Sequence, residues 1–235
     1  MTSELVQTGE GAFLVAQPDG SPRGTLVVLH DIFGLSDYID DVASELTGRG
    51  WLVVAPALFS RDGIVRVGYD DLEVGSAAAA RLSAGQVLSD FDAGVALAAG
   101  RVPPGSPVAA LGFCLGGSLA SYLATERALD ACVSFYGGVT RGEAEDMPSL
   151  LDSIADIGAP WLGIYGEDDP FIPIADVHEL EGRADGFRVP AEIATYPGGH
   201  AFHRHTTPDY YSPASAPLAW ERAMAWLDRY AGTRA

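Results

Sequence analysis

Short apolar runs that alternate with helical patterns are the feature that most constrains the fold of this chain. Each run has the length of one strand and is rich in Val, Ile, Leu and aromatic residues. Apolar strands separated by helices indicate a mainly parallel sheet that helices cover on both faces, an α/β fold. The predicted strands are residues 12–17, 25–30, 51–58, 108–113, 131–137, 160–166 and 191–197. The predicted helices are residues 36–50, 76–101, 118–129, 174–184 and 213–231, with an irregular stretch at 59–75.

The composition fits one α/β domain that spans residues 1–235. Hydrophobic residues make up 48% of the 235 residues, which is enough to fill a sizeable core. Pro and Gly are spread between the predicted elements, and no repeat or low-complexity tract divides the chain. We therefore expect a single sheet and a single core.

The charge of the chain argues against nucleic acid and anionic membranes as partners. The formal net charge is −18, and all 14 basic residues are Arg. An acidic surface repels polyanions, so an acidic substrate would need a locally placed Arg. The acidity can equally be a general property of a solvated surface, without any bearing on function.

The N-terminal residues and the cysteine count suggest a cytoplasmic protein. The sequence starts with "MTSELVQTGEG", which has neither the basic nor the apolar region of a secretory signal. The longest apolar runs are too short to span a bilayer. Two cysteines, Cys114 and Cys132, are too few for a disulfide framework. We expect a monomer or a small homo-oligomer.

The stretch "GFCLGG" places Cys114 between a predicted strand and a predicted helix. Its glycines match the G-x-S-x-G nucleophile elbow, with Cys in place of Ser. Such a turn exposes the nucleophile, points the N–H of Leu115 at a developing oxyanion, and adds a helix N-terminus that favours thiolate. The structural alternative is a buried Cys in a Gly-rich turn. Cys132 lies within an apolar strand and is predicted to belong to the core.

Two later segments can supply a base and its orienting carboxylate. "GEDDPFIP" and "YPGGHAFHR" each follow a predicted strand, so an Asp and His200 would emerge at the carboxyl edge of the sheet. The chain order Cys, Asp, His is that of the α/β hydrolases. His203 and His205 could join His200 as metal ligands, but their spacing fits no helical face, and we expect no metal ion. His30 and His178 are predicted to be structural.

The segment "LHDIFGLSDYI" follows the predicted strand at 25–30. Hydrolases of this fold take a second oxyanion donor from the equivalent loop, which would be the N–H of Ile32. Asp31 could be a plain turn residue. The residues alone do not decide between these roles.

Together these motifs resemble the dienelactone hydrolase family, the carboxymethylenebutenolidases. "HDIFGL", "GFCLGGSLA", "FYGG", "GEDDPFIP" and "GGHAFHR" stand in the order of that family and span nearly the whole chain. The resemblance implies an α/β-hydrolase fold and no cofactor. It implies a triad with Cys114 as the nucleophile, His200 as the base and Asp169 as the orienting carboxylate. It also implies that the N–H groups of Leu115 and Ile32 are the oxyanion donors. Finally, it implies that the Asp31 carboxylate contacts the resting thiol and that Arg204 binds a substrate carboxylate.

The sequence departs from the family before the long predicted helix. Members of the family hold a second substrate-binding Arg and several aromatic residues in that segment. Here it reads "GYDDLEVGSAAAA", and Arg66 and Arg81 flank it without aligning cleanly. The sequence does not say whether residues 60–75 form a lid.

The predicted function is hydrolysis of a small activated ester or lactone, with or without a carboxylate, through a thioester on Cys114. Sulfur favours substrates that expel a good leaving group, because a thiolate is itself easily expelled from the tetrahedral state. One alternative is a general carboxylesterase or thioesterase of the same fold, in which Arg204 has no substrate role. The other is a non-catalytic binding protein or a thiol redox sensor.

Overall fold

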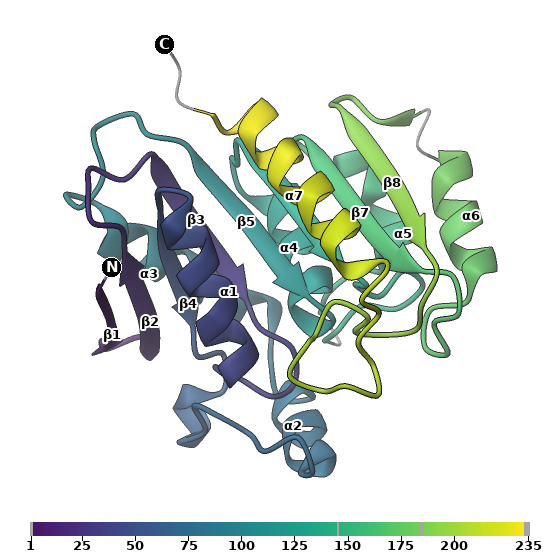
Figure 1. The fold of residues 1–235 in the computed structure, drawn as a ribbon, viewed down its shortest axis with the longest axis horizontal. Helices are drawn as coiled ribbons and strands as arrows, with labels where there is room; N and C mark the ends of the chain where they lie inside the picture. The colour runs from purple at the N-terminus through teal and green to yellow at the C-terminus, as the bar shows by residue number, and fades with distance from the viewer. Residues whose placement is uncertain (1, 145, 184–185, 233–235) are drawn as a thin grey trace.

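One eight-stranded sheet forms the centre of the molecule in the computed structural model (Figure 1), which describes residues 2–144, 146–183 and 186–232. The strand order is β1-β2-β4-β3-β5-β6-β7-β8. Strands β3, β4, β5, β6, β7 and β8 run parallel to one another. Strand β1 is antiparallel to β2, and β2 is antiparallel to β4. The bounds are β1 Thr2–Gln7, β2 Ala12–Gln17, β3 Gly24–Leu29, β4 Trp51–Pro56, β5 Val108–Phe113, β6 Ala131–Phe135, β7 Trp161–Gly166 and β8 Ala191–Tyr196.

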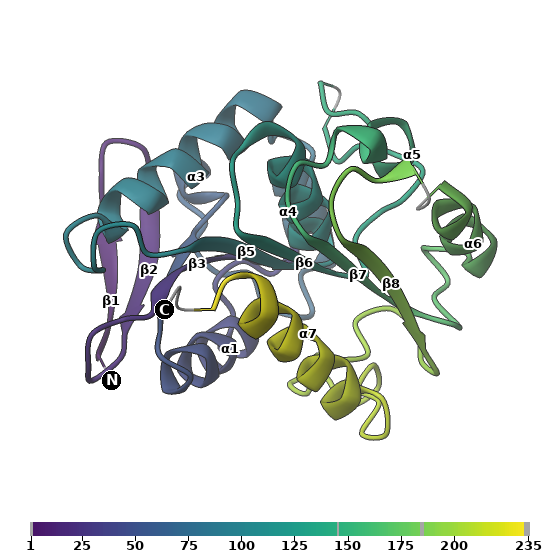
Figure 2. The same ribbon diagram turned by 90° about the horizontal axis from the view of Figure 1, so that it is seen from above.

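Helices cover both faces of this sheet, as the apolar runs predict. Viewed along the sheet, α1 and α7 lie on one face, and α3, α4, α5 and α6 lie on the other (Figure 2). Strands β3, β4, β6 and β7 are buried throughout because both of their faces pack against helices. The bounds are α1 Asp37–Gly48, α2 Leu72–Ala79, α3 Ala84–Ala98, α4 Leu115–Glu126, α5 Leu150–Ser153, α6 Ile174–Arg183 and α7 Ala216–Tyr230.

The structure corrects two predicted elements. Strand β1 was not predicted because nearly all of its residues are exposed at the edge of the sheet, so it carries no apolar alternation. The predicted helix at 76–101 is two helices. α2 already begins at Leu72, inside the stretch expected to be irregular, and α3 begins after Ser83, whose hydroxyl accepts the N–H of Gln86 at 3.3 Å.

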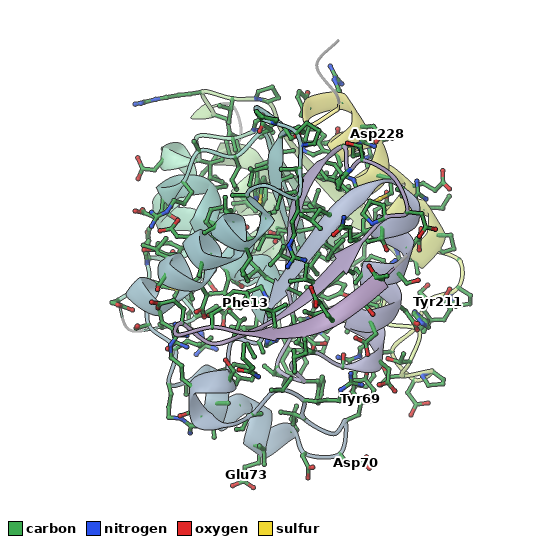
Figure 3. The ribbon with its side chains drawn as sticks, turned by 90° about the vertical axis from the view of Figure 1, so that its left-hand side faces the viewer. Phe13, Tyr69, Asp70, Glu73, Tyr211 and Asp228 are labelled. Carbon is green, nitrogen blue, oxygen red and sulfur yellow. The ribbon has the colours of Figure 1, made fainter. Side chains whose placement is uncertain are left out.

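The carboxyl ends of β3, β5, β6, β7 and β8 meet at one edge of the sheet. Beyond this edge lie α2 and the segment that joins β8 to α7 (Figure 1). Asp70 and Glu73 project outward from the α2 region in Figure 3 and are exposed. Loops at this edge of a parallel sheet are where sites form in open α/β folds, so the candidate site is sought there.

Candidate active site

The turn between β5 and α4 holds Cys114 in a strained backbone conformation. Its φ is 55° and its ψ is −118°, which non-glycine residues rarely adopt. The flanking glycines are required because a Cβ at Gly112 would lie 1.9 Å from the carbonyl oxygen of Gly116. A Cβ at Gly116 would lie 2.0 Å from the carbonyl oxygen of Leu29. The turn therefore has the geometry of a nucleophile elbow, with a half-buried thiol at its tip.

A hydrogen-bonded chain connects this thiol to an imidazole and a carboxylate. His200 Nε2 lies 3.0 Å from Cys114 Sγ, and His200 Nδ1 lies 2.8 Å from Asp169 Oδ2. The other oxygen of Asp169 accepts the N–H groups of Phe171 and Ile172 at 2.8 and 3.1 Å. Asp169 is buried and fixed from both sides. The neighbouring Asp168 is exposed.

The protonation of His200 is set by its two neighbours. Burial by itself lowers the pKa of the imidazole, but Cys114 and Asp169 together outweigh burial and raise it to about 10. An imidazole with this pKa is protonated at neutral pH. It is then the counter-ion that a thiolate needs.

Two backbone N–H groups beside the thiol have no acceptor among the residues that the structure describes. They belong to Leu115, the first residue of α4, and to Ile32, in the loop after β3. Both residues line the same cavity as Cys114. Free N–H groups at a helix start and in the opposite loop are the usual donors of an oxyanion hole.

Asp31 and Arg204 form a buried ion pair in the wall of the cavity. Arg204 Nη1 donates to Asp31 Oδ2 at 2.8 Å, and Asp31 Oδ1 accepts the N–H of Phe33 at 2.9 Å. The side chains are only 3% and 7% exposed, respectively. Among the described residues, the Asp31 carboxylate thus forms hydrogen bonds with Arg204 and Phe33 and none with Cys114.

The guanidinium of Arg204 is held by more than its ion pair. Its Nε donates to Thr207 Oγ1 at 2.8 Å. Its carbon atom Cζ lies about 5 Å from the ring centres of Phe33, Tyr69 and Tyr210, at 4.8, 5.3 and 5.4 Å. Cation–π contacts of this kind fix the plane of a guanidinium. The remaining nitrogen, Nη2, has no hydrogen-bond partner within the described part of the chain.

Neither of the two flanking arginines lies in the cavity wall. Arg66 pairs with Asp37 and Asp40 of α1, and Arg81 pairs with Asp62 at 2.9 Å. The cavity instead contains three charged residues that the sequence analysis missed, Asp176 of α6 and, from the loop after β6, Arg141 and Glu143. The loop after β6 also follows a parallel strand, which is a signal for a site, but the predicted site residues all come from the ends of four other strands.

Glu143 is half-buried and is hydrogen-bonded to the helix that carries the elbow. Its Oε1 accepts the hydroxyl of Ser118, in the first turn of α4, at 2.6 Å. Burial raises the pKa of Glu143, although Ser118, Arg141 and His200 oppose this shift. Ser118 Oγ also accepts the N–H of Gly138 at 2.7 Å. These bonds attach the loop after β6 to the helix that carries the thiol.

The other histidines lie in separate environments. His203 Nδ1 is 2.7 Å from the hydroxyl of Tyr38, and its ring stacks on Trp220 at 5.0 Å. Burial lowers the pKa of His203 to about 4. His205 pairs with Asp41 at the surface, His178 is exposed on α6, and the buried His30 accepts the N–H of Leu58 at 3.0 Å. Cys132 is fully buried in β6.

The cavity beside Cys114 has a volume of about 570 Å³. Its walls come from the loop after β3, from α2, from the loop after β6 and from the segments that follow β7 and β8. The class of this protein follows from a mainly parallel sheet, a strained elbow after β5 and a histidine after the last strand that lies 3.0 Å from the thiol: it is an α/β hydrolase.

Comparison with known proteins identifies the family within this class. The model of the dienelactone hydrolase family matches residues 12–231. A protein of Methylorubrum extorquens named "Putative carboxymethylenebutenolidase" is 32% identical over 223 residues, which cover 93% of this chain and 76% of that protein. A protein of Escherichia coli K12 with the same name is 33% identical over 221 residues, covering 93% and 81%.

A solved structure agrees with this assignment. The crystal structure of a "Putative Dienelactone Hydrolase" from Klebsiella pneumoniae subsp. pneumoniae matches with a TM-score of 0.87 at 28% identity, over 97% of this chain and 99% of the other. The chain belongs to the dienelactone hydrolase family and is a hydrolase. The predicted family and fold are therefore confirmed. In the described part of the chain, no helix has the length and apolar character needed to cross a membrane.

Proposed function

We propose that this hydrolase cleaves activated esters or lactones with a Cys114–His200–Asp169 triad, through a thioester on Cys114. The observation that supports this most directly is the position of His200, whose two ring nitrogens lie 3.0 Å from the thiol and 2.8 Å from the carboxylate. An imidazole that bridges a nucleophile and an orienting carboxylate is the arrangement of a catalytic triad.

The first half of the proposed reaction forms the thioester. The resting pair is the Cys114 thiolate and the His200 imidazolium. The thiolate attacks the substrate carbonyl, and the N–H groups of Leu115 and Ile32 stabilise the resulting oxyanion by roughly 3–4 kcal/mol per donor. As the tetrahedral state collapses, the bond to the leaving oxygen breaks, and that oxygen takes the proton of His200.

The second half releases the acid. His200, now neutral and oriented by Asp169, removes a proton from a water molecule that attacks the thioester carbonyl. The carbon–sulfur bond breaks and the thiolate returns to its imidazolium partner. Because thiolate leaves readily, the first step succeeds with enols, phenols and thiols as leaving groups, and amides are poor substrates.

We propose that Arg204 binds the carboxylate of an acidic substrate. Its guanidinium lines the cavity, and Nη2 is not engaged by a described residue, so this nitrogen can donate to an anion. Asp31 keeps the guanidinium in place. Because Asp31 lines the same cavity as Cys114, we also propose that its charge modulates the thiol. Substrates with and without a carboxylate test this role, and Arg204→Ala should raise KM only for the acidic ones.

The test of the triad is the Cys114→Ala variant. Hydrolysis of p-nitrophenyl acetate should be lost, whereas Cys132→Ala, a change in the core, should keep most of it. Mass spectrometry of the wild-type enzyme quenched during turnover should find one added acetyl group on the peptide that contains Cys114. Ester hydrolysis retained in Cys114→Ala, with the fold intact by circular dichroism, would contradict the proposal.

A general carboxylesterase or thioesterase is the second candidate. It is favoured by the positions of Arg66 and Arg81, which pair with carboxylates outside the cavity, and by the engagement of Arg204 with Asp31. A screen of enol lactones, aryl esters and thioesters, each with and without a free carboxylate, separates the two candidates. A general esterase would show no preference for the acidic member of each pair.

A further inference from the structure

Exposed apolar side chains gather at the mouth of the cavity. Three of the large hydrophobic side chains that are most exposed in the described residues line it, namely Leu72, Phe171 and Tyr210, which are 56%, 73% and 52% exposed. They come from three distant segments of the chain. Apolar groups that remain exposed around a concave site are a sign of a bound apolar ligand.

The wall formed by α2 carries no charge toward the cavity. The residues of this helix that line it are Leu72, Ser76 and Ala79, spaced four and three apart, so they share one face. The part of a ligand that lies against α2 is therefore not recognised by an ion pair. Small and apolar side chains there leave room for a flat hydrophobic group.

Phe171 connects this apolar mouth to the reacting atoms. Its ring centre lies 5.2 Å from that of His200, and the two planes meet at 82°, an edge-to-face contact. In the proposed mechanism His200 protonates the leaving oxygen. The alcohol portion of the ester is the part bonded to this oxygen, so it lies on the His200 side of the site, next to Phe171.

The size of the cavity agrees with a bulky substrate. A volume of about 570 Å³ is in the range of pockets that enclose drug-sized ligands. A small lactone would leave much of this space to water.

We propose that Phe171, Leu72 and Tyr210 form a subsite for an aromatic alcohol portion, so that this enzyme prefers esters with a large apolar aryl leaving group. The proposal rests on the proposed function, since it uses the role of His200. It goes beyond it by naming which half of the ester is recognised and by which side chains.

The experiment compares phenyl acetate with 2-naphthyl acetate, whose leaving alcohols have similar acidity. We expect kcat/KM to be higher for the naphthyl ester. Phe171→Ala should reduce the naphthyl-to-phenyl ratio about fivefold to tenfold, because the second ring loses its apolar contact. Phe171→Leu should restore part of the ratio. Leu218→Ala, which removes another exposed apolar side chain, on α7, should leave the ratio unchanged.

The naphthyl-to-phenyl ratio of kcat/KM separates recognition of the aryl group from damage to the catalytic groups. The N–H of Phe171 binds Asp169, so Phe171→Ala can slow both esters, but such a loss cancels in the ratio. A ratio that Phe171→Ala leaves unchanged overturns the proposal. The proposal is also overturned if Phe171→Ala changes the preference for the acyl half instead, measured as kcat/KM for phenyl hexanoate against phenyl acetate. Hydrolysis that persists in Cys114→Ala would instead signal failure of the proposed function itself.

Discussion

Gly75 of α2 lies directly against the carbonyl of Ile32, so closely that a Cβ at position 75 would be 2.3 Å from that oxygen. Any side chain there must push α2 and the loop after β3 apart. Because Ile32 is a proposed oxyanion donor, we expect Gly75→Ala to lower kcat by about tenfold or more, as is typical when such a donor is displaced. Steady-state kinetics with p-nitrophenyl acetate measure this.

Gly85 of α3 is the matched control for this substitution. It is also a helical glycine, but a Cβ there meets nothing within 4 Å. Gly85→Ala should leave kcat unchanged and stabilise the fold by about 0.5–1 kcal/mol, the usual gain from Ala over Gly in a helix. Equal kinetics for the two variants would show that the contact with Ile32 does not position the donor.

The reactivity of Cys114 should depend on the charge of His200. The pKa of His200 is raised from 6.5 to about 10, so the imidazole stays charged between these values, where a free imidazole is neutral. This cation lies beside the sulfur of Cys114 and favours its thiolate form. In His200→Asn, which carries no charge, the rate of reaction with iodoacetamide should therefore fall about tenfold at pH 7.

The rate is measured by mass spectrometry of the Cys114 peptide. Cys132 provides an internal reference, because burial raises the pKa of its thiol and excludes the reagent in the folded protein. A rate at pH 7 that His200→Asn leaves unchanged would show that no ion pair forms.

Exchange of a single carboxylate distinguishes the two aspartates of "GEDDPFIP". Asp169→Asn should lower kcat/KM by about 10²–10⁴-fold, because the amide can stabilise the wrong tautomer of His200 and cannot balance its charge. Asp168→Asn should stay within about threefold of wild type, since that side chain is exposed and outside the chain of hydrogen bonds. A large loss in the Asp168 variant would reassign the orienting carboxylate.

The sequence was sufficient to place Cys114 and His200 at the same edge of the sheet. Cys114 directly follows β5, His200 lies four residues after the end of β8, and parallel strands bring their carboxyl ends to one edge. The choice of Asp169 over Asp168 came only from the family resemblance. Both residues follow β7. The turn directs only the carboxylate of Asp169 inward, where it accepts two backbone N–H groups.

The walls of the cavity depend on packing between distant segments. Arg141 and Glu143 line it because the loop after β6 is attached to Ser118, which no local pattern reveals. No local pattern reveals the ion pair of Asp31 either, because its partner Arg204 lies 173 positions away in the chain. The start of α2 was missed because only the face toward the sheet edge is buried, so its apolar signal is weak.

The buried pair of Asp31 and Arg204 should matter for stability far more than the exposed ion pairs. Asp31→Ala leaves a guanidinium buried without its counter-ion, which we expect to cost about 3–5 kcal/mol in the free energy of unfolding. Asp37→Ala is the control, because Asp37 pairs with Arg66 at the surface, where its side chain is 76% exposed. That change should cost less than about 1 kcal/mol.

Urea denaturation at pH 7 measures both variants. The double variant Asp31→Ala with Arg204→Met removes both charges, so it should recover part of the stability that Asp31→Ala loses, since the apolar stem can still pack against Phe33 and Tyr69. Two results would show that the guanidinium does not depend on Asp31 for its charge balance. One is an equal loss of unfolding free energy in Asp31→Ala and Asp37→Ala. The other is a double variant in which Arg204→Met adds its full loss of unfolding free energy to that of Asp31→Ala.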